Sequence, residues 1–406
     1  MEAPLSRWLR ISFLNLLIVA SLGVILRYKI AFAFPYLDQK HLLHGHSHFA
    51  FSGWITQILM VLLIQYLNQK NGRDNFKQYK TMLYANLITA YGMLIFFPIQ
   101  GYGFGSITFS TLSIFVSYVF AIKYWKDLNR LNENCVSHYW FKAALIFSAL
   151  SSLGAFSLAF MMVNKMLHQN WYLAAVYYFL HFQYNGWFFF AAMGLFVSRI
   201  EKIIVADKLL KAVFWLFAFA CLPAFFLSAL WMSIHFIVYW IVVASAIAQC
   251  IGWFVFVKLL LKNKVFLHNS FSKLGGQLFV LSAVALTIKL LLQLGSTHPA
   301  LSQIAFGFRP IVIGYLHLVL LGVITIFILG FTISTQLLHS KKYFKSGVWI
   351  FVGGIILNET LLMVHGVASL TYTIVPFINV FLFMAALVMF LGILLLNSNI
   401  KNPIKQ

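Results

Sequence analysis

The stretch HLLHGHSHFAFSGWITQILMVLLIQYL (His41–Leu67) decides the fold class. Four histidines (His41, His44, His46 and His48) open it, and a run of uncharged, mostly apolar residues follows. As an α-helix, about 20 such residues are long enough to cross a hydrocarbon core of about 30 Å. The stretch therefore predicts a membrane-spanning helix that begins in a cluster of imidazoles.

The rest of the chain has the same character. Of its 406 residues, 62% are hydrophobic and 9% are charged, whereas a soluble domain has about 25% charged residues. We therefore expect an all-α polytopic membrane protein with a single transmembrane domain over residues 1–406. Apolar runs predict twelve spans, at residues 10–28, 44–66, 79–99, 104–123, 141–162, 172–197, 210–231, 234–257, 274–295, 310–334, 346–365 and 372–396.

The net charge of +21 predicts topology and not nucleic-acid binding, because the basic residues lie in short loops between apolar runs. Of the 29 lysines and arginines, 23 fall on one side of the predicted membrane and five on the other. Lys289 falls inside a predicted span. By the positive-inside rule both termini are expected in the cytoplasm, with the chain in the inner (plasma) membrane and the lipid bilayer as its partner.

The cysteines argue against two kinds of site. Cys135, Cys221 and Cys250 are far apart and form no C-x-x-C or C-x-x-C-H motif. Covalent c-type haem and a thiolate metal centre are therefore not expected.

The histidines are concentrated in the predicted outer half of the membrane, which holds ten of the thirteen. Only three belong to the expected cytoplasmic side: His138, His268 and His339. Histidines inside a membrane are uncommon and are often functional. Neutral imidazole is also the commonest metal ligand and binds haem iron.

Three of these histidines share a motif, in which a glycine follows five residues later. The motif occurs as HFAFSGW from His48, HFQYNGW from His181 and HLVLLGV from His317, at intervals of 133 and 136 residues. Because each interval is about a third of the chain, we expect three four-helix repeats in a pseudo-threefold arrangement, each offering one imidazole.

Other interpretations of the histidines stay open. His181 or His317 could be an interhelical histidine that is hydrogen-bonded within the protein. His41 and His46 could be polar residues at the membrane interface. His44 and His48 lie four residues apart, so they share a helix face and could act together.

A haem held by two imidazoles needs histidines at matching depth on two facing helices, with small residues beside the ring. His48 and His317 meet this description, with Gly53 and Gly322 one turn below. Arg309, about two turns above His317, could meet the haem propionates or serve as an interfacial anchor.

The twelve-span plan, the cytoplasmic termini and the histidines in the second, sixth and tenth spans resemble subunit I of the haem-copper oxidase superfamily. The resemblance implies haem b ligation by His48 (with His44 or His46 as alternatives) and His317, and a copper-side role for His181. The candidate metal-binding residues are His44, His46, His48, His181, His317 and His365.

The chain departs from that family after His181, where the family's proline, glutamate and tyrosine signature is absent, and at two places in its histidines. The span at 210–231 has no histidine, where the family has adjacent ones, and the span at 310–334 has one instead of two. The sequence therefore lacks the full histidine set of an oxygen-reducing centre. It also resembles the smaller NnrS-like membrane proteins, which have twelve helices, contain haem and copper and are linked to nitric oxide metabolism.

Two charged residues lie inside predicted spans. Each costs roughly 2.5–3.5 kcal/mol at mid-helix on an insertion scale. Glu359 could relay protons, pair with Lys289, accept a bond from a metal-bound imidazole or lie protonated between helices. Lys289 could otherwise extend its ammonium towards the membrane surface.

The leading hypothesis is a membrane haem protein for electron transfer or redox chemistry on O2 or NO. It would be an oxidoreductase similar to terminal oxidases or nitric oxide reductases, with quinol or a periplasmic donor and other respiratory subunits as partners. The alternatives are an NnrS-like, non-oxidase protein that handles nitric oxide or copper, and a cofactor-free transporter.

Overall fold

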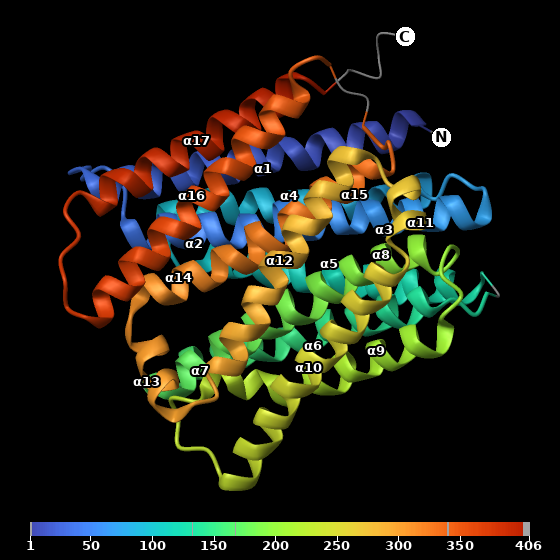
Figure 1. Cartoon of the computed structure of the whole chain (residues 1–406). Coiled ribbons are helices and arrows are strands. Elements are labelled where there is room, and N and C mark those ends of the chain that lie inside the picture. Colours follow the sequence, from blue (N-terminus) through green and yellow to red (C-terminus); the bar gives the residue numbers. More distant parts are fainter. Residues whose placement is uncertain (1, 132, 167, 339–340, 401–406) are drawn as a thin grey trace. The chain divides into compact units, whose positions relative to one another are not determined.

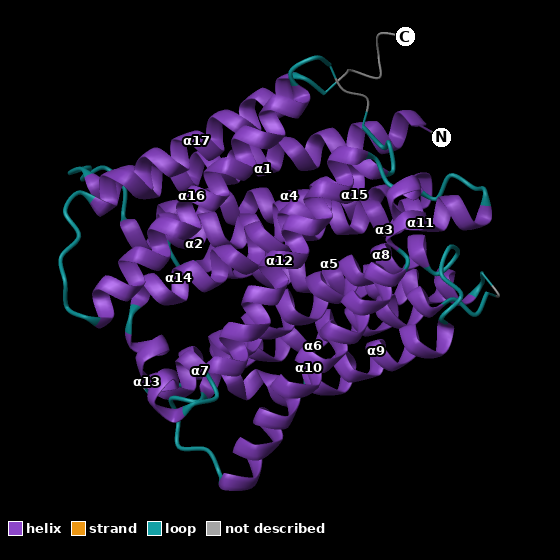
Figure 2. Ribbon diagram, in the orientation of Figure 1, coloured by secondary structure: helices purple, strands orange, loops and turns teal. Residues whose placement is uncertain are grey.

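A computed structural model describes residues 2–131, 133–166, 168–338 and 341–400, without the side chains of residues 2, 3 and 304–306. His339, Lys401 and Lys405, which the sequence predicts on the cytoplasmic side, lie outside these ranges. Within them the chain is mostly helical, with loops and turns between the helices, and forms no strand (Figures 1 and 2). The all-α prediction is confirmed for this part of the chain.

The helices form two compact units. The first unit contains residues 1–131 and 332–406. Its helices are α1 (Glu2–Ala31), α2 (Gln39–Phe49), η1 (Ala50–Thr56), α3 (Gln57–Asn71), α4 (Phe76–Gln100), α5 (Phe104–Asn129), α16 (Phe344–Leu370) and α17 (Ile378–Ser398). The C-terminal helix α17 packs along both α16 and the N-terminal α1 (Figure 1), and the amide of Asn397 donates to the carbonyl of Phe13 at 3.1 Å.

The second unit contains residues 132–331. Its helices are α6 (Val136–Val163), α7 (Gln169–His181), η2 (Phe182–Phe188), α8 (Phe189–Ile200), α9 (Asp207–Cys221), η3 (Pro223–Ala229), α10 (Phe236–Lys262), α11 (Lys264–Ser270), α12 (Lys273–Gly295), α13 (Pro299–Gly307), α14 (Arg309–His317) and η4 (Leu318–Thr325). The helix α15 (Ile326–Ser334) begins in this unit and ends in the first.

All twelve ranges expected to span the membrane are largely helical. In the described residues ten helices are long and apolar enough to cross a membrane, or eleven if the bent pair α9 and η3 is one span. The helix made of α7, η2 and α8 is not among them. Its tyrosines, amides and histidine lower its mean hydropathy, although the range 172–197 was expected to span the membrane.

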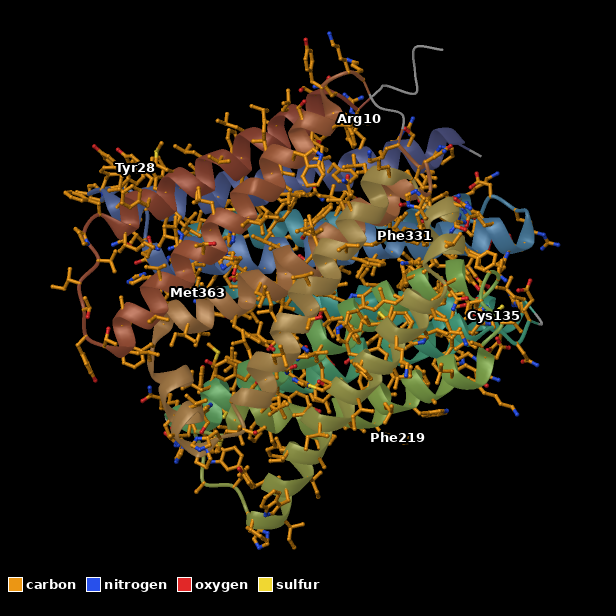
Figure 3. The ribbon with its side chains drawn as sticks, viewed as in Figure 1. Arg10, Tyr28, Cys135, Phe219, Phe331 and Met363 are labelled. Carbon is orange, nitrogen blue, oxygen red and sulfur yellow. The ribbon has the colours of Figure 1, made fainter. Side chains whose placement is uncertain are left out.

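The side chains exposed on the helices indicate that lipid surrounds them. Large apolar side chains are exposed along them, among them Phe219 at 67% and Met363 at 64% (Figure 3). A soluble protein rarely exposes so much apolar surface, whereas lipid tails cover it without cost. The chain is therefore a multi-pass membrane protein.

Individual residues set the helix ends that matter for the histidines. The carboxylate of Asp38 accepts from the backbone N–H of His41 at 2.8 Å and so caps the start of α2. Gly101 ends α4 with a φ of +59°, and a Cβ there would lie 2.5 Å from Nε2 of His41. Only glycine suits this position, because the backbone is left-handed and the His41 ring fills the space.

Candidate functional site: histidines and π-helical segments

Three segments of π-helix follow the three motif histidines. The π-helical segment η1 begins two residues after His48, η2 directly after His181, and η4 directly after His317. Each contains the glycine of the motif: Gly53, Gly186 and Gly322. π-Helix makes up well under 1% of residues in proteins and is frequent at functional sites. Each copy of the motif therefore coincides with a rare backbone conformation.

A π-helical turn changes the backbone pairing of a helix, and carbonyls in these segments accept bonds from neighbouring helices. In η1, the amide of Asn15 donates to the Gly53 carbonyl at 2.6 Å, and the amide of Asn86 donates to the Ser52 carbonyl at 3.1 Å. In η4, the Ser282 hydroxyl donates to the Val323 carbonyl at 2.8 Å. These bonds satisfy backbone groups where lipid offers no partner.

In the first unit, His44 and His48 lie on one face of α2, against aromatic residues from α4 and the following turn. The ring of Phe97 stacks on His48 with centroids 4.2 Å apart and planes 17° apart. Tyr102 meets His44 edge-on at 4.7 Å. We call these four residues the histidine face. The expected shared helix face of His44 and His48 is therefore present.

The ring nitrogens of the histidine face are not engaged by the protein. Nε2 of His44 is buried and has no hydrogen-bond partner in the described structure. The ring of His48 makes no hydrogen bond within the same ranges, and its backbone carbonyl accepts from Ser52 at 2.7 Å. Most buried polar atoms in proteins have a partner, so an exception such as Nε2 of His44 is an atom available to a ligand.

The other two histidines of the cluster point elsewhere. His46 faces α1, where its ring carbon lies 3.6 Å from the place that a Cβ on Gly23 would occupy. His41 lies against Gly101 at the end of α4. The cluster is thus divided among three neighbours, and only His44 and His48 share one face.

In the second unit, both ring nitrogens of His181 are hydrogen-bonded and the side chain is fully buried. Nε2–H donates to the Cys221 carbonyl at 2.9 Å, because a carbonyl can only accept. Nδ1 therefore accepts from the Asn185 amide at 3.1 Å. This is the interhelical hydrogen-bonded arrangement that the sequence left open for His181.

A break in α9 supplies the carbonyl for His181. The helix ends at Cys221, and η3 begins at Pro223 with a bend of 47°. Proline has no N–H to donate, and carbonyls in the last turn of a helix lack partners in that helix. The sequence does not indicate the contact between Cys221 and His181, because nothing local reveals that α7 packs beside η3.

His317 lies at the end of α14 and is partly exposed. Its Nδ1–H donates to the Ile313 carbonyl at 2.8 Å. The neutral ring then carries no proton on Nε2, and a metal-binding histidine usually shows this arrangement. Arg309, the first residue of α14, is exposed.

A second polar group surrounds Lys289 in the second unit. Lys289 is only 5% exposed, so its ammonium does not reach the membrane surface. It makes no hydrogen bond or ion pair in the described part of the chain, and Cys221 and Cys250 are within electrostatic range. Two amide oxygens are buried without partners: that of Gln293, four residues after Lys289 on α12, and that of Gln249, next to Cys250 on α10.

In the first unit, Glu359 lies on α16, and its carboxylate accepts from the neighbouring Asn358 amide at 3.0 Å. Arg27 of α1 is within electrostatic range of both Glu359 and His365. His365 is partly exposed near the end of α16. Glu359 and Lys289 belong to different units, so their expected pairing stays a prediction.

Among the described residues, no three His, Cys, Asp or Glu side chains lie close enough together to hold a metal ion. No family model matches the chain, and no curated protein matches it.

Proposed function

We propose that the protein is an integral membrane haem protein with one axial ligand from the histidine face. His317, which belongs to the second unit, stays the sequence-based candidate for the other axial ligand. The observation that carries the proposal is the buried, unpartnered Nε2 of His44 beside the unbonded ring of His48. A polar atom kept in this state costs about 1–3 kcal/mol, which ligation would recover. Phe97 and Tyr102 supply the apolar wall that a flat macrocycle needs.

His317 supports the second axial position. The bond from its Nδ1–H to the Ile313 carbonyl orients the ring and leaves Nε2 as the basic nitrogen. Arg309 stands two turns earlier on the same helix, exposed, and would balance the negative charge of haem propionates. His48 is the first candidate for the other axial bond, with His44 as the alternative.

The repeated π-helical segments support the twelve-helix, pseudo-threefold plan expected from the sequence. Each repeat would have the histidine and π-helical segment on its second helix. In this plan α7, η2 and α8 form a span, enclosed by other helices, that tolerates its polar residues. The resemblance to haem-copper oxidase subunit I, or to its NnrS-like branch, agrees with such repeats.

Bound haem b would supply one-electron chemistry and a binding position for a diatomic gas such as O2 or NO. The chain would hold the iron ligands, exclude water with its aromatic residues and set access from one side of the membrane. A quinol or a periplasmic protein would donate electrons, in the inner membrane, with other respiratory subunits as further partners. The residues near His181 do not fit copper, because both nitrogens of His181 are already bonded.

The test is the pyridine haemochrome spectrum of purified protein, with reduced-minus-oxidised absorption as a second readout. We expect haem b bands in the wild type and their loss in His48→Ala and His317→Ala. His44→Ala distinguishes the two candidate ligands of α2. The exposed His268 of α11 gives a matched control, because His268→Ala should keep the full spectrum.

A colourless wild type, purified from cells supplied with haem, would contradict the proposal. So would unchanged bands in both single variants His44→Ala and His48→Ala and in their double variant. Turnover of O2 or NO by coloured protein would then separate an oxidoreductase from an NnrS-like protein that handles nitric oxide or copper.

One observation favours a transporter as the second candidate. Transporters place broken helices beside their polar binding residues, and α9 is broken at Pro223 beside the buried His181. This function predicts a colourless protein that moves a solute in vesicles.

A further inference from the structure

The helix α5 has an exposed stripe whose character changes along its length. Its middle turns expose apolar side chains, with Phe115 and Val119 at 52% and Ile122 at 59%. The last two turns expose the basic residues Lys126 and Arg130. An apolar stripe that ends in cations matches the two parts of a phospholipid, its acyl chain and its headgroup.

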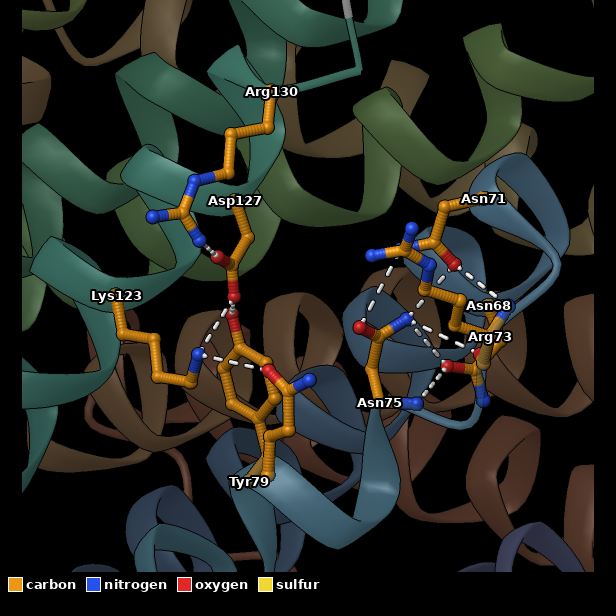
Figure 4. A network of polar contacts seen from close by, with 9 residues as sticks. Asn68, Asn71, Arg73, Asn75, Tyr79, Lys123, Asp127 and Arg130 are labelled. Atoms are coloured by element: carbon orange, nitrogen blue, oxygen red, sulfur yellow. Dashed lines mark hydrogen bonds and ion pairs between the residues drawn. The ribbon is translucent and has the colours of Figure 1, made fainter.

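A polar network holds the basic end of α5 in place (Figure 4). Asp127 is its centre: one carboxylate oxygen accepts from Lys123 and from the Tyr79 hydroxyl, each at 2.8 Å, and the other accepts from Arg130 at 3.1 Å. The Lys123 ammonium also lies over the Tyr79 ring, 4.6 Å from its centroid. Two cations are thus fixed at one place by a carboxylate that is itself anchored to α4.

The charges around this network do not balance. Asp127 is turned inward, with 12% of its side chain exposed, whereas 77% of Arg130 is exposed. With Lys126, three cations and one carboxylate lie at this end of α5. The same residues line a depression of about 330 Å³ together with two apolar ones; its lining is Val119, Ile122, Lys123, Lys126, Asp127 and Arg130.

We propose that this depression binds the headgroup phosphate of an anionic phospholipid whose acyl chain lies on the exposed stripe of α5. Arg and Lys beside a membrane surface recognise lipid phosphates, and Arg can form two bonds to one phosphate. A bilayer lipid fits better than a free phosphate, because the apolar side chains of Val119 and Ile122 also line the depression and continue into the exposed stripe. The lysine count predicts the cytoplasmic leaflet for this site.

The test measures binding of phosphatidylglycerol to the full-length protein in detergent by native mass spectrometry, with phosphatidylcholine as the neutral lipid. We expect phosphatidylglycerol to bind preferentially, and the double variant Lys126→Gln with Arg130→Gln to bind it about thirtyfold more weakly. Lys208→Gln with Lys211→Gln on α9 removes the same charge elsewhere and should leave binding unchanged.

Two further arms identify the source of the phosphate. Inorganic phosphate should not displace the lipid, and Val119→Gln with Ile122→Gln should weaken lipid binding although all cations remain. Equal binding of both lipids, an equal loss in the α9 control, or displacement by inorganic phosphate would overturn the proposal.

Discussion

The histidine face of the first unit and the His181 site of the second begin from the same motif and end in opposite chemical states. In both, a histidine precedes a π-helical segment that contains a glycine. At the histidine face the protein leaves ring nitrogens unbonded, whereas at His181 it uses both. The motif accompanies a π-helical backbone in both units, and the neighbouring helices determine whether the imidazole nitrogens are hydrogen-bonded within the protein.

The elements that pack against His48 and His181 bring different chemical groups to the two rings. The helix α4 brings the apolar ring of Phe97 to His48, and the two rings are stacked. The N–H of an imidazole lies in the plane of its own ring, so a stacked phenyl ring gives it no acceptor. The broken helix α9 brings a carbonyl to His181, and η2 itself supplies the Asn185 amide. A ligand can therefore compete for the first site more easily than for the second.

The largest expected effect is from His181→Leu, which tests the structural role directly. The change leaves the Asn185 amide and the Cys221 carbonyl buried and unpaired, at a cost of about 1–3 kcal/mol each. We expect a marked fall in the thermal unfolding midpoint in detergent. His44→Leu in haem-free protein should leave the midpoint unchanged or raise it, because an unpartnered nitrogen is removed. An equal fall in the unfolding midpoint of His181→Leu and His44→Leu would contradict the difference between the two sites.

The second prediction concerns the buried Lys289 near the His181 site. Lys289→Met removes an ammonium without a hydrogen-bond partner in the described residues, and a charge at mid-membrane costs roughly 2.5–3.5 kcal/mol on an insertion scale. We therefore expect a higher unfolding midpoint for Lys289→Met. Lys289→Arg keeps the charge and should give no gain. A lower midpoint for Lys289→Met would mean that the ammonium has a stabilising partner.

Particular residues show how far the sequence could predict this structure. The twelve helical ranges follow from local hydropathy, so they were predictable, and the position of the π-helical segments was marked by the repeated glycine. Asn185 could have been found, because it lies one turn after His181 on the same face. The π-helical pairing itself depends on donors from other helices, such as Asn15, and was not predictable.

Contacts between helices account for the misses. Cys221 reaches His181 only because α7 packs beside η3, and no local pattern encodes that packing. Lys289 was expected to extend outward or to pair with Glu359. Its burial depends on which helices surround α12, which a single sequence does not reveal.

The third prediction compares the glycines of two π-helical segments. A Cβ on Gly186 would lie 2.5 Å from Cβ of Phe147, an atom fixed to the α6 backbone. A Cβ on Gly322 would lie 3.2 Å from Cβ of Ala285, which a small shift can relieve. We expect Gly186→Ala to cost about 1–3 kcal/mol of stability and Gly322→Ala to be close to neutral, measured as unfolding midpoints. Similar costs in both would show that glycine is needed for the π-helical backbone itself.

The smallest expected effect concerns Asp38, which caps the helix that carries the histidine face. The backbone N–H of His41 lowers the pKa of Asp38 below its ordinary value of 3.8. Because the folded-state pKa is the lower one, the cap stabilises the fold above the unfolded pKa and loses its effect as pH falls through the folded pKa. The unfolding midpoint of Asp38→Ala should thus fall below that of wild type at neutral pH and approach it below pH 3.8. Asp38→Asn caps the helix without titrating, so its unfolding midpoint should fall less than that of wild type as the pH is lowered through this range. If the difference in midpoint between wild type and Asp38→Ala were constant with pH, the carboxylate charge would have no part in starting α2.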